Sequence, residues 1–244
     1  MPKRELNLEN TLQFFVSQLE QLYGEDLISV TLYGSTAGVD YNPERSDLNF
    51  LVILKELDLN QLRKSVSLVK GWPQRRIATP LFLDPSLLES SLALFPMEFL
   101  EMKDQHETLH GSDPLATLEV PAKYLKFQCE QELKGKQLRL HSAYLEAQAQ
   151  QPALEELLIA SVKSFGVIMR TLLRLKGLQP PREFLEILTE IERVFHLQPD
   201  GFREAHQLRM GFRRFDRDEA ETLYKRLMHD VTSLADKAED CFRE

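Results

Sequence analysis

Cysteine, tryptophan and long apolar runs are scarce in this sequence. It contains only two cysteines, Cys129 and Cys241, and both fall inside helical patterns. This argues against a disulfide framework and against a cysteine zinc site. No run reaches the roughly 18 apolar residues of a membrane span, and the N-terminal stretch MPKRELNLEN lacks the apolar core of a signal peptide. We therefore expect a cytoplasmic protein with reduced cysteines and no membrane partner.

Basic residues are also fewer than acidic ones, 30 against 38. The net charge of −8 argues against a general nucleic-acid binder, because such proteins present a basic surface to the phosphate backbone. The imbalance belongs to residues 1–120, with 18 acidic against 10 basic side chains, whereas residues 121–244 carry 20 of each. With 43% hydrophobic and 28% charged residues among 244, the composition is that of a globular protein with one large or two modest domains.

Two apolar runs rich in β-branched residues, 27–33 and 48–54, flank a small and polar connection. This pattern predicts a strand, a turn and a second strand. Gly34 and Ser35 follow the first run directly. Glycine at such a place lets backbone N–H groups approach an anion closely, so the connection is suited to hold a phosphate group.

The second run opens with two oxygen-bearing side chains, Asp47 and Asn49. They share one face of the predicted strand, because side chains alternate across a strand. Gly-Ser, an eleven-residue spacer and then Asp-Leu-Asn-Phe resembles the signature of the nucleotidyltransferase superfamily, above all its aminoglycoside and minimal members. The resemblance implies that Gly34 and Ser35 bind a nucleoside triphosphate, that Asp47 ligates Mg²⁺, and that a nucleoside monophosphate is transferred to an acceptor that the sequence does not identify.

The sequence departs from this pattern at the acidic positions. Asn49 stands where the family has a second carboxylate, and the predicted third strand offers Thr79 where the family has a third. Asp84 precedes a proline and is better explained as a helix cap, although Asp84 or Glu101 could complete the site. Mg²⁺ is usually held by carboxylates together with substrate phosphates, so we expect a weak or absent metal site. Slow nucleotidyl transfer, an inactive nucleotide-binding or regulatory module and a helical-bundle interaction protein all remain open.

The expected fold class is α+β, with a mixed-sheet nucleotidyltransferase-like domain at residues 1–120 and an all-α antiparallel bundle at residues 121–244. In the first domain, Asp58 is predicted to cap a helix that carries Leu62, Val66 and Val69. Pro80 places the third strand at an edge or a bulge. The other elements expected there are a helix at 6–23, strands at 76–83 and 97–103, and a turn-rich exit at 110–115.

The second half is predicted to contain five helices, at 121–149, 153–176, 182–196, 201–214 and 217–240. The first carries an apolar pattern that includes Phe127, Leu138 and Leu145. The inner stripe of the bundle is expected to include Leu157, Phe165, Ile168, Leu188, Leu227 and Val231.

A cluster of arginines, at 203, 209, 213, 214 and 217, stands out in an otherwise acidic protein. Two explanations remain open, a solvated helix face with local salt bridges or a basic lip that receives phosphate or faces the first domain. Because folds of this type often dimerise through their helical parts, a homodimer is a further expectation that the sequence does not decide.

Overall fold

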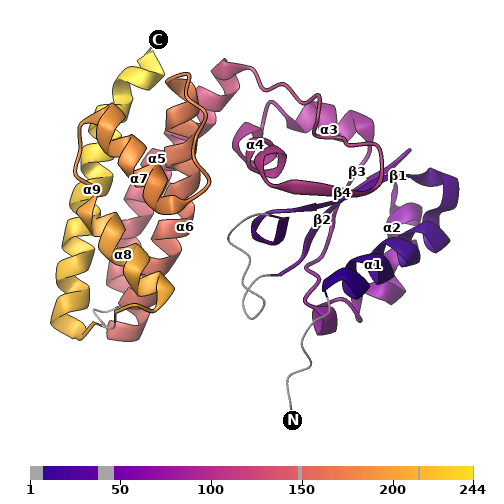
Figure 1. The fold of residues 1–244 in the computed structure, drawn as a ribbon, viewed down its shortest axis with the longest axis horizontal. Coiled ribbons are helices and arrows are strands. Elements are labelled where there is room, and N and C mark those ends of the chain that lie inside the picture. Colours follow the sequence, from indigo (N-terminus) through magenta and orange to yellow (C-terminus); the bar gives the residue numbers. More distant parts are fainter. Residues whose placement is uncertain (1–7, 38–46, 148–149, 214, 244) are drawn as a thin grey trace. The chain divides into compact units, whose positions relative to one another are not determined.

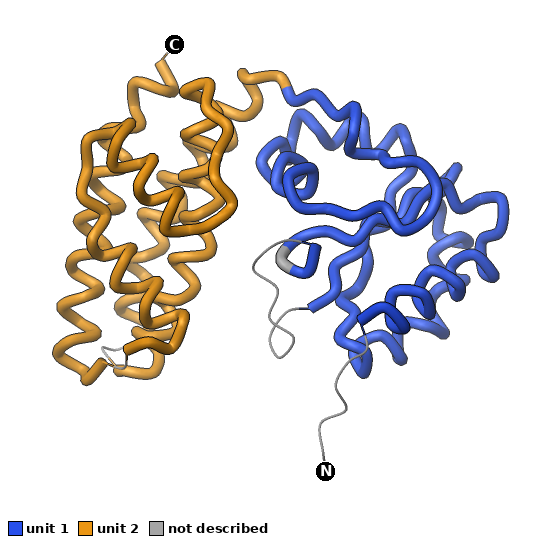
Figure 2. Tube along the Cα trace, viewed as in Figure 1, with its two compact units in different colours: residues 1–120 blue, residues 121–244 orange. Residues whose placement is uncertain are grey.

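The computed structural model describes residues 8–37, 47–147, 150–213 and 215–243. The chain divides into two compact units, Met1–Val120 and Pro121–Glu244 (Figure 2). Within the described residues, no helix is long and apolar enough to cross a membrane.

Unit 1 is built on a four-stranded mixed sheet (Figure 1). Its strand order is β3-β2-β1-β4, with antiparallel pairing of β1 with β2 and β4, and parallel pairing of β2 with β3. The register places Tyr33 at the end of β1 opposite Asn49 at the start of β2. The strands are β1 Leu27–Tyr33, β2 Asn49–Leu54, β3 Leu81–Leu83 and β4 His106–Gly111.

Helices cover both faces of this sheet, and β2 is buried on both sides. Phe50 and Val52 belong to one apolar cluster, which Phe15 of α1 (Leu8–Tyr23) completes. Leu51 and Ile53 point to the other face, where they pack with Phe99 of α4 (Pro96–Asp104). The alternation expected for a strand therefore distributes one run of apolar residues between two cores. The remaining helices of this unit are α2 Leu59–Val69 and α3 Pro85–Ser91.

The predicted strand at 97–103 is wrong, because this segment lies in α4. Pro96 occupies the first turn of that helix, where the fixed φ of proline suits a helix and its missing N–H costs nothing. The fourth strand is β4, directly after α4. The predicted strand at 76–83 is confirmed only over β3, at the sheet edge, with an isolated bridge from Ile77 to Leu48 before it.

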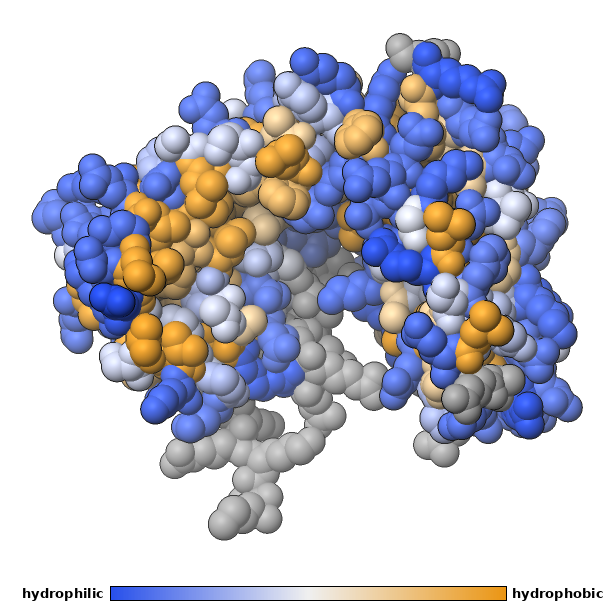
Figure 3. All heavy atoms as spheres, turned by 180° about the vertical axis from the view of Figure 1, so that it is seen from behind, coloured by the Kyte–Doolittle hydropathy of each residue, from blue (hydrophilic) through white to orange (hydrophobic). Residues whose placement is uncertain are grey.

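The outer side of α2 carries apolar residues. Leu62, Val66 and Val69 are 38, 61 and 37% exposed, whereas the buried residue of this helix is Ser65. The Ser65 hydroxyl is 2.7 Å from the hydroxyl of Tyr23 on α1, so a polar contact and not a leucine stripe joins these two helices. Figure 3 shows hydrophobic side chains gathered on the surface of unit 1.

Unit 2 is a bundle in which α6 contacts the four other helices. Phe165, Ile168, Leu188, Leu227 and Val231 are buried as predicted, whereas Leu157 is only half-buried. The helices are α5 Ala122–Ala147, α6 Gln151–Leu175, α7 Phe184–Phe195, α8 Asp200–Met210 and α9 Arg217–Arg243.

The apolar pattern of α5 is divided between core and solvent. Leu133 and Leu140 are buried, whereas Phe127, Leu138 and Leu145 are each about 70% exposed. The mixed α+β architecture expected from the sequence is confirmed, but apolar spacing alone did not identify which side of this helix packs.

Candidate functional site

The turn after β1 begins at Gly34, whose φ of +82° is in the left-handed region. Glycine adopts this conformation without the clash that a Cβ would cause. The Gly34 N–H donates to the carbonyl of Gln105 at 2.9 Å, and its own carbonyl accepts from the N–H of Ala37 at 2.9 Å. The N–H groups of Gly34 and Ala37 are therefore already bonded, and an anion at this turn would be met by the N–H groups between them, in the short 3₁₀ turn Ser35–Ala37.

Asp47 and Asn49 lie next to this turn. The hydroxyl of Thr36 donates to the Asp47 carbonyl at 3.1 Å, which joins the turn to the residues that lead into β2. The amide Nδ2 of Asn49 lies 3.5 Å from the same carbonyl, a long hydrogen bond. The side chain of Asp47 is 67% exposed. The structure thus brings Gly34, Asp47 and Asn49 to one place, at the end of β1 and the start of β2. The side chain of Ser35 falls outside what the structure describes.

The predicted metal ligands do not fit a two-metal site. Asp47 contributes one carboxylate and Asn49 a neutral amide, whereas Mg²⁺ in phosphoryl-transfer sites relies on several anionic oxygens. Across residues 8–37, 47–147, 150–213 and 215–243, no group of three His, Cys, Asp or Glu side chains is placed to hold a metal ion. Asp84 accepts the N–H of Leu87 at 2.8 Å and caps α3, as predicted.

Sequence reasoning missed a cation beside Asp47. The Nε atom of Arg76 lies 4.0 Å from Oδ1 of Asp47. Both residues line a cavity of about 240 Å³, together with Trp72 and Thr79. The signal available in the sequence was weak, because Arg76 belongs to a short Trp-Pro-Gln-Arg-Arg segment that indicates only a turn.

The exit from unit 1 is fixed by a hydrogen-bonded pair, His106 and Asp113. His106 opens β4 opposite Tyr33, and its Nε2 lies 3.0 Å from Oδ2 of Asp113. Burial raises the pKa of Asp113, but His106 and the backbone N–H groups of Leu115 and Ala116 outweigh it and lower the pKa below its usual value. The Gly-Ser-Asp-Pro exit is therefore held in place by the ionised form of Asp113.

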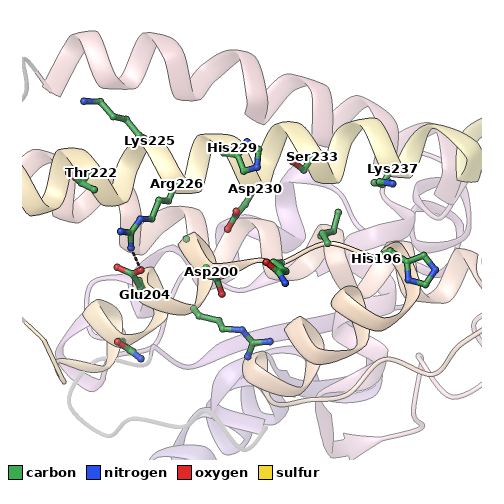
Figure 4. A pocket seen from close by; sticks show the side chains of 15 residues that line it. His196, Asp200, Glu204, Thr222, Lys225, Arg226, His229, Asp230, Ser233 and Lys237 are labelled. Atoms are coloured by element: carbon green, nitrogen blue, oxygen red, sulfur yellow. Dashed lines mark hydrogen bonds and ion pairs between the residues drawn. The ribbon is translucent and has the colours of Figure 1, made fainter.

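A further cavity lies within unit 2, along α9 (Figure 4). It measures about 1070 Å³, and its lining includes both polar and apolar groups. Its cations are paired locally, since Arg226 contacts Glu204 and Lys225 lies 3.3 Å from Glu221. This groove therefore presents no concentrated charge of one sign.

A buried carboxylate, Asp230, lies at the base of this groove. It accepts the N–H of Phe202 at 3.1 Å, and so caps α8 from the neighbouring helix. Burial raises its pKa to about 6, partly offset by the N–H groups of Phe202 and Gly201. Asp230 is thus explained by the packing of α8 on α9.

Two members of the arginine cluster are engaged in salt bridges. Arg203 lies 2.6 Å from Glu192, and Arg213 lies 3.0 Å from Glu219. Arg214 falls outside the described residues. These contacts favour the solvated-face explanation over a basic lip.

Comparison with known proteins agrees with the fold. No protein-family model and no curated protein matches the sequence. Among solved structures, the chain is similar to a spectinomycin adenyltransferase from Enterococcus faecialis, determined with ATP and spectinomycin. The TM-score is 0.57 and the identity 11%, over 96% of this chain and 100% of that chain. At this identity the likeness concerns the fold alone, an α+β domain followed by a helical domain.

Proposed function

We propose that unit 1 binds a nucleoside triphosphate at the turn that begins with Gly34, and that the protein is a nucleotidyltransferase-like nucleotide-binding module with little or no metal-dependent transfer. One observation carries this proposal. A fold like that of an adenyltransferase places a left-handed glycine turn against Asp47 and Asn49, where the sequence resembles the family signature, yet supplies only one carboxylate from that signature.

The residues have separate roles in this proposal. The backbone after Gly34 holds phosphate oxygens through N–H groups, as short turns do in other anion sites. Asp47 is the residue best placed to approach a cation that accompanies the triphosphate, because its carboxylate is exposed. Asn49 offers a dipole but no charge, so two-metal activation of an acceptor is not expected. Residues 121–244 form the helical domain that accompanies this module.

Slow nucleotidyl transfer is the second candidate function. It is favoured by the likeness to an adenyltransferase whose structure was determined with ATP and spectinomycin. In that case the bond from the α-phosphorus to pyrophosphate breaks, and a bond to an acceptor hydroxyl oxygen forms. The acceptor would be a small hydroxylated molecule, and Asp47 would be indispensable.

Calorimetry with ATP, with and without Mg²⁺, tests the main proposal. The full chain should bind ATP in both conditions, and Gly34→Ala should weaken binding because alanine disfavours φ of +82°. Gly24→Ala is the matched control. Gly24 also has a positive φ of +52° with open space around it, but it lies before the opposite end of β1. Absence of ATP binding to the unmodified protein in both conditions would overturn the proposal.

A pyrophosphate-release assay over a panel of aminoglycoside and aminocyclitol acceptors separates the two candidates. Little or no release supports the binding module. Robust Mg²⁺-dependent release that Asp47→Ala abolishes would instead establish transfer.

A further inference from the structure

Arg76 has a backbone conformation that is unusual for its residue type. Its φ is +59°, in the left-handed region. It closes the turn Pro73–Arg75: its N–H donates to the Pro73 carbonyl at 3.0 Å, and the next N–H, of Ile77, donates to the Trp72 carbonyl at 3.0 Å. Glycine usually occupies this position of such a turn, because it has no Cβ. An arginine there is strained, and strain of this kind is concentrated at functional sites.

The strained turn positions Arg76 next to the candidate site. The N–H of Leu48 donates to the Arg76 carbonyl at 2.8 Å, and the N–H of Ala78 donates to the Leu48 carbonyl at 3.0 Å. These two bonds fix the backbone of Arg76 beside the residue that follows Asp47. The side chain of Arg76 is 25% exposed, against 67% for Asp47. A partly desolvated cation therefore stands next to an accessible carboxylate.

The adjoining cavity offers further donors. Trp72 is 2% exposed, and over the described part of the chain its indole Nε1–H meets no acceptor. A buried donor without an acceptor is unfavourable and is rare in folded proteins. Thr79 contributes a hydroxyl to the same cavity of about 240 Å³, which is large enough to admit a phosphate group. Residues that carry guanidinium, indole and hydroxyl donors therefore line one cavity, and such donors suit an anion.

A fixed positive charge at this place also disfavours a divalent cation. Two like charges a few ångströms apart repel each other, and Arg76 already partly neutralises Asp47. A guanidinium has five N–H donors in a planar fork, so it can contact a carboxylate and a phosphate at once. Arg76 can therefore take the part that a metal ion plays in binding phosphate.

We propose that Arg76 is the resident cation of the site: its guanidinium binds a phosphate group of the nucleotide in the cavity beside Asp47, so that nucleotide binding does not require a divalent metal. This inference rests on the proposed nucleotide-binding function and names the residue that replaces the metal.

Trp72 provides a local probe, because it is the single tryptophan of the chain and it lines this cavity. Its fluorescence in the full-length protein is titrated with inorganic triphosphate and with ATP, each in EDTA and in Mg²⁺. The dissociation constants should agree within about threefold between EDTA and Mg²⁺. Arg76→Gln should weaken both ligands by about tenfold or more, as expected for loss of a charge-assisted hydrogen bond.

Two further variants control for the fold. Arg76→Gly removes the charge and relieves the strained φ, so it should weaken binding as Arg76→Gln does while the protein unfolds at an equal or higher temperature. Arg75→Gln removes the adjacent cation, which lies over the ring of Phe14 at 4.0 Å, and should leave both affinities within about twofold of the unmodified protein.

The outcomes distinguish this inference from the function on which it rests. ATP binding that needs Mg²⁺, or that survives Arg76→Gln, overturns the role of Arg76 and leaves the nucleotide-binding function standing. Binding of inorganic triphosphate through Arg76 without any binding of ATP supports the anion site and overturns the nucleotide function. Absence of binding of either ligand overturns both.

Discussion

Asn49 controls how much negative charge the candidate site holds. Its side chain is adjacent to Asp47, and an amide contributes a dipole where a carboxylate contributes a full charge. The charge at this position is therefore the most direct way to change the affinity of the site for cations.

Asn49→Asp should raise the affinity for Mn²⁺ or Mg²⁺ about five- to tenfold, which corresponds to about 1 kcal/mol for an added charge near the surface. Calorimetric titration with Mn²⁺ measures this. Asn60→Asp is the matched control, because Asn60 is an exposed amide whose Nδ2 lies 3.4 Å from Oδ2 of Asp58. An unchanged affinity in Asn49→Asp would show that the two side chains do not share a cation. Transfer activity need not appear, since Thr79 leaves the third acidic position without a carboxylate.

Asp230 is a second residue whose charge depends on its surroundings. Burial raises its pKa to about 6, above the usual value of 3.8, so the folded state holds this proton more tightly than the unfolded state does. The resulting stabilisation is fully present below about pH 4 and is lost as the pH rises through about 6.

Asp230→Asn should therefore flatten the dependence of stability on pH. Between pH 4 and pH 7, the free energy of unfolding of the unmodified protein should fall by about 1–2 kcal/mol more than that of Asp230→Asn, after allowance for partial solvent access. Urea unfolding at several pH values measures the difference. Asp236→Asn, at an exposed position of the same helix, should follow the unmodified protein. Parallel pH profiles for Asp230→Asn and the unmodified protein would contradict the assignment.

At the scale of elements, α8 and α9 cross at the backbone of Gly201. A Cβ added there would lie 2.6 Å from the Leu227 nitrogen and 2.7 Å from the carbonyl carbon of Arg226. Backbone atoms cannot move aside as the end of a side chain can, so this crossing requires glycine.

Gly201→Ala should lower the free energy of unfolding by about 1–3 kcal/mol through overpacking. Gly135→Ala, on α5, should have the opposite sign and raise it by up to about 1 kcal/mol. A Cβ at Gly135 meets only the flexible end of Arg139, at 3.5 Å, and alanine favours a helix interior. Chemical denaturation of both variants tests the pair. If both variants changed the free energy of unfolding in the same direction, helix propensity, and not the crossing of α8 and α9, would determine the effect of Gly201→Ala.

The bundle core can be tested on α6. Phe165 is 1% exposed, and its ring centroid lies 5.4 Å from that of Phe202 on α8. Phe165→Ala should cost about 3–5 kcal/mol, the sum of lost burial and the cavity left behind. Phe127→Ala, at a position 71% exposed, should change stability by less than about 0.5 kcal/mol. Thermal or urea unfolding measures both, and similar losses for the two phenylalanines would refute the assignment of inside and outside.

At the scale of the whole molecule, the chain consists of two compact units, and the two apolar clusters on either face of the sheet are formed by residues of unit 1 alone. Unit 2 buries Phe165, Leu227 and Val231 among its own helices, and a domain of this length can bury enough surface to fold alone.

Residues 121–244 expressed alone should therefore be helical and unfold in one cooperative transition. Far-ultraviolet circular dichroism with thermal unfolding tests this. In the full chain, Phe165→Ala should lower the transition of unit 2 and leave that of residues 1–120 in place. A non-cooperative isolated unit 2 would show that its core depends on the first unit.

The sequence by itself determined the elements that depend on neighbours along the chain. The alternating run from Phe50 to Ile53 gave β2 its two buried faces. Asp58 and Asp84 were predicted as caps from the residues that follow them, and in the structure each accepts an N–H three residues ahead. The helices of unit 2 followed from apolar spacing. Apolar spacing failed where two periods fit one segment, as at 97–103, or where both sides of a helix are apolar, as in α5.

Only the tertiary structure decided the chemistry of the candidate site. Arg76 stands beside Asp47 because the parallel bridge from Leu48 to Ile77 joins segments that are distant along the chain. The N–H of Gly34 is bonded to the carbonyl of Gln105, which lies outside the predicted strands at 27–33 and 48–54 that flank the turn. Such pairings are set by the packing of the whole sheet, and local propensity contains no information about them. The sequence therefore indicated which residues could bind phosphate, whereas the fold decided that Arg76 lies beside Asp47.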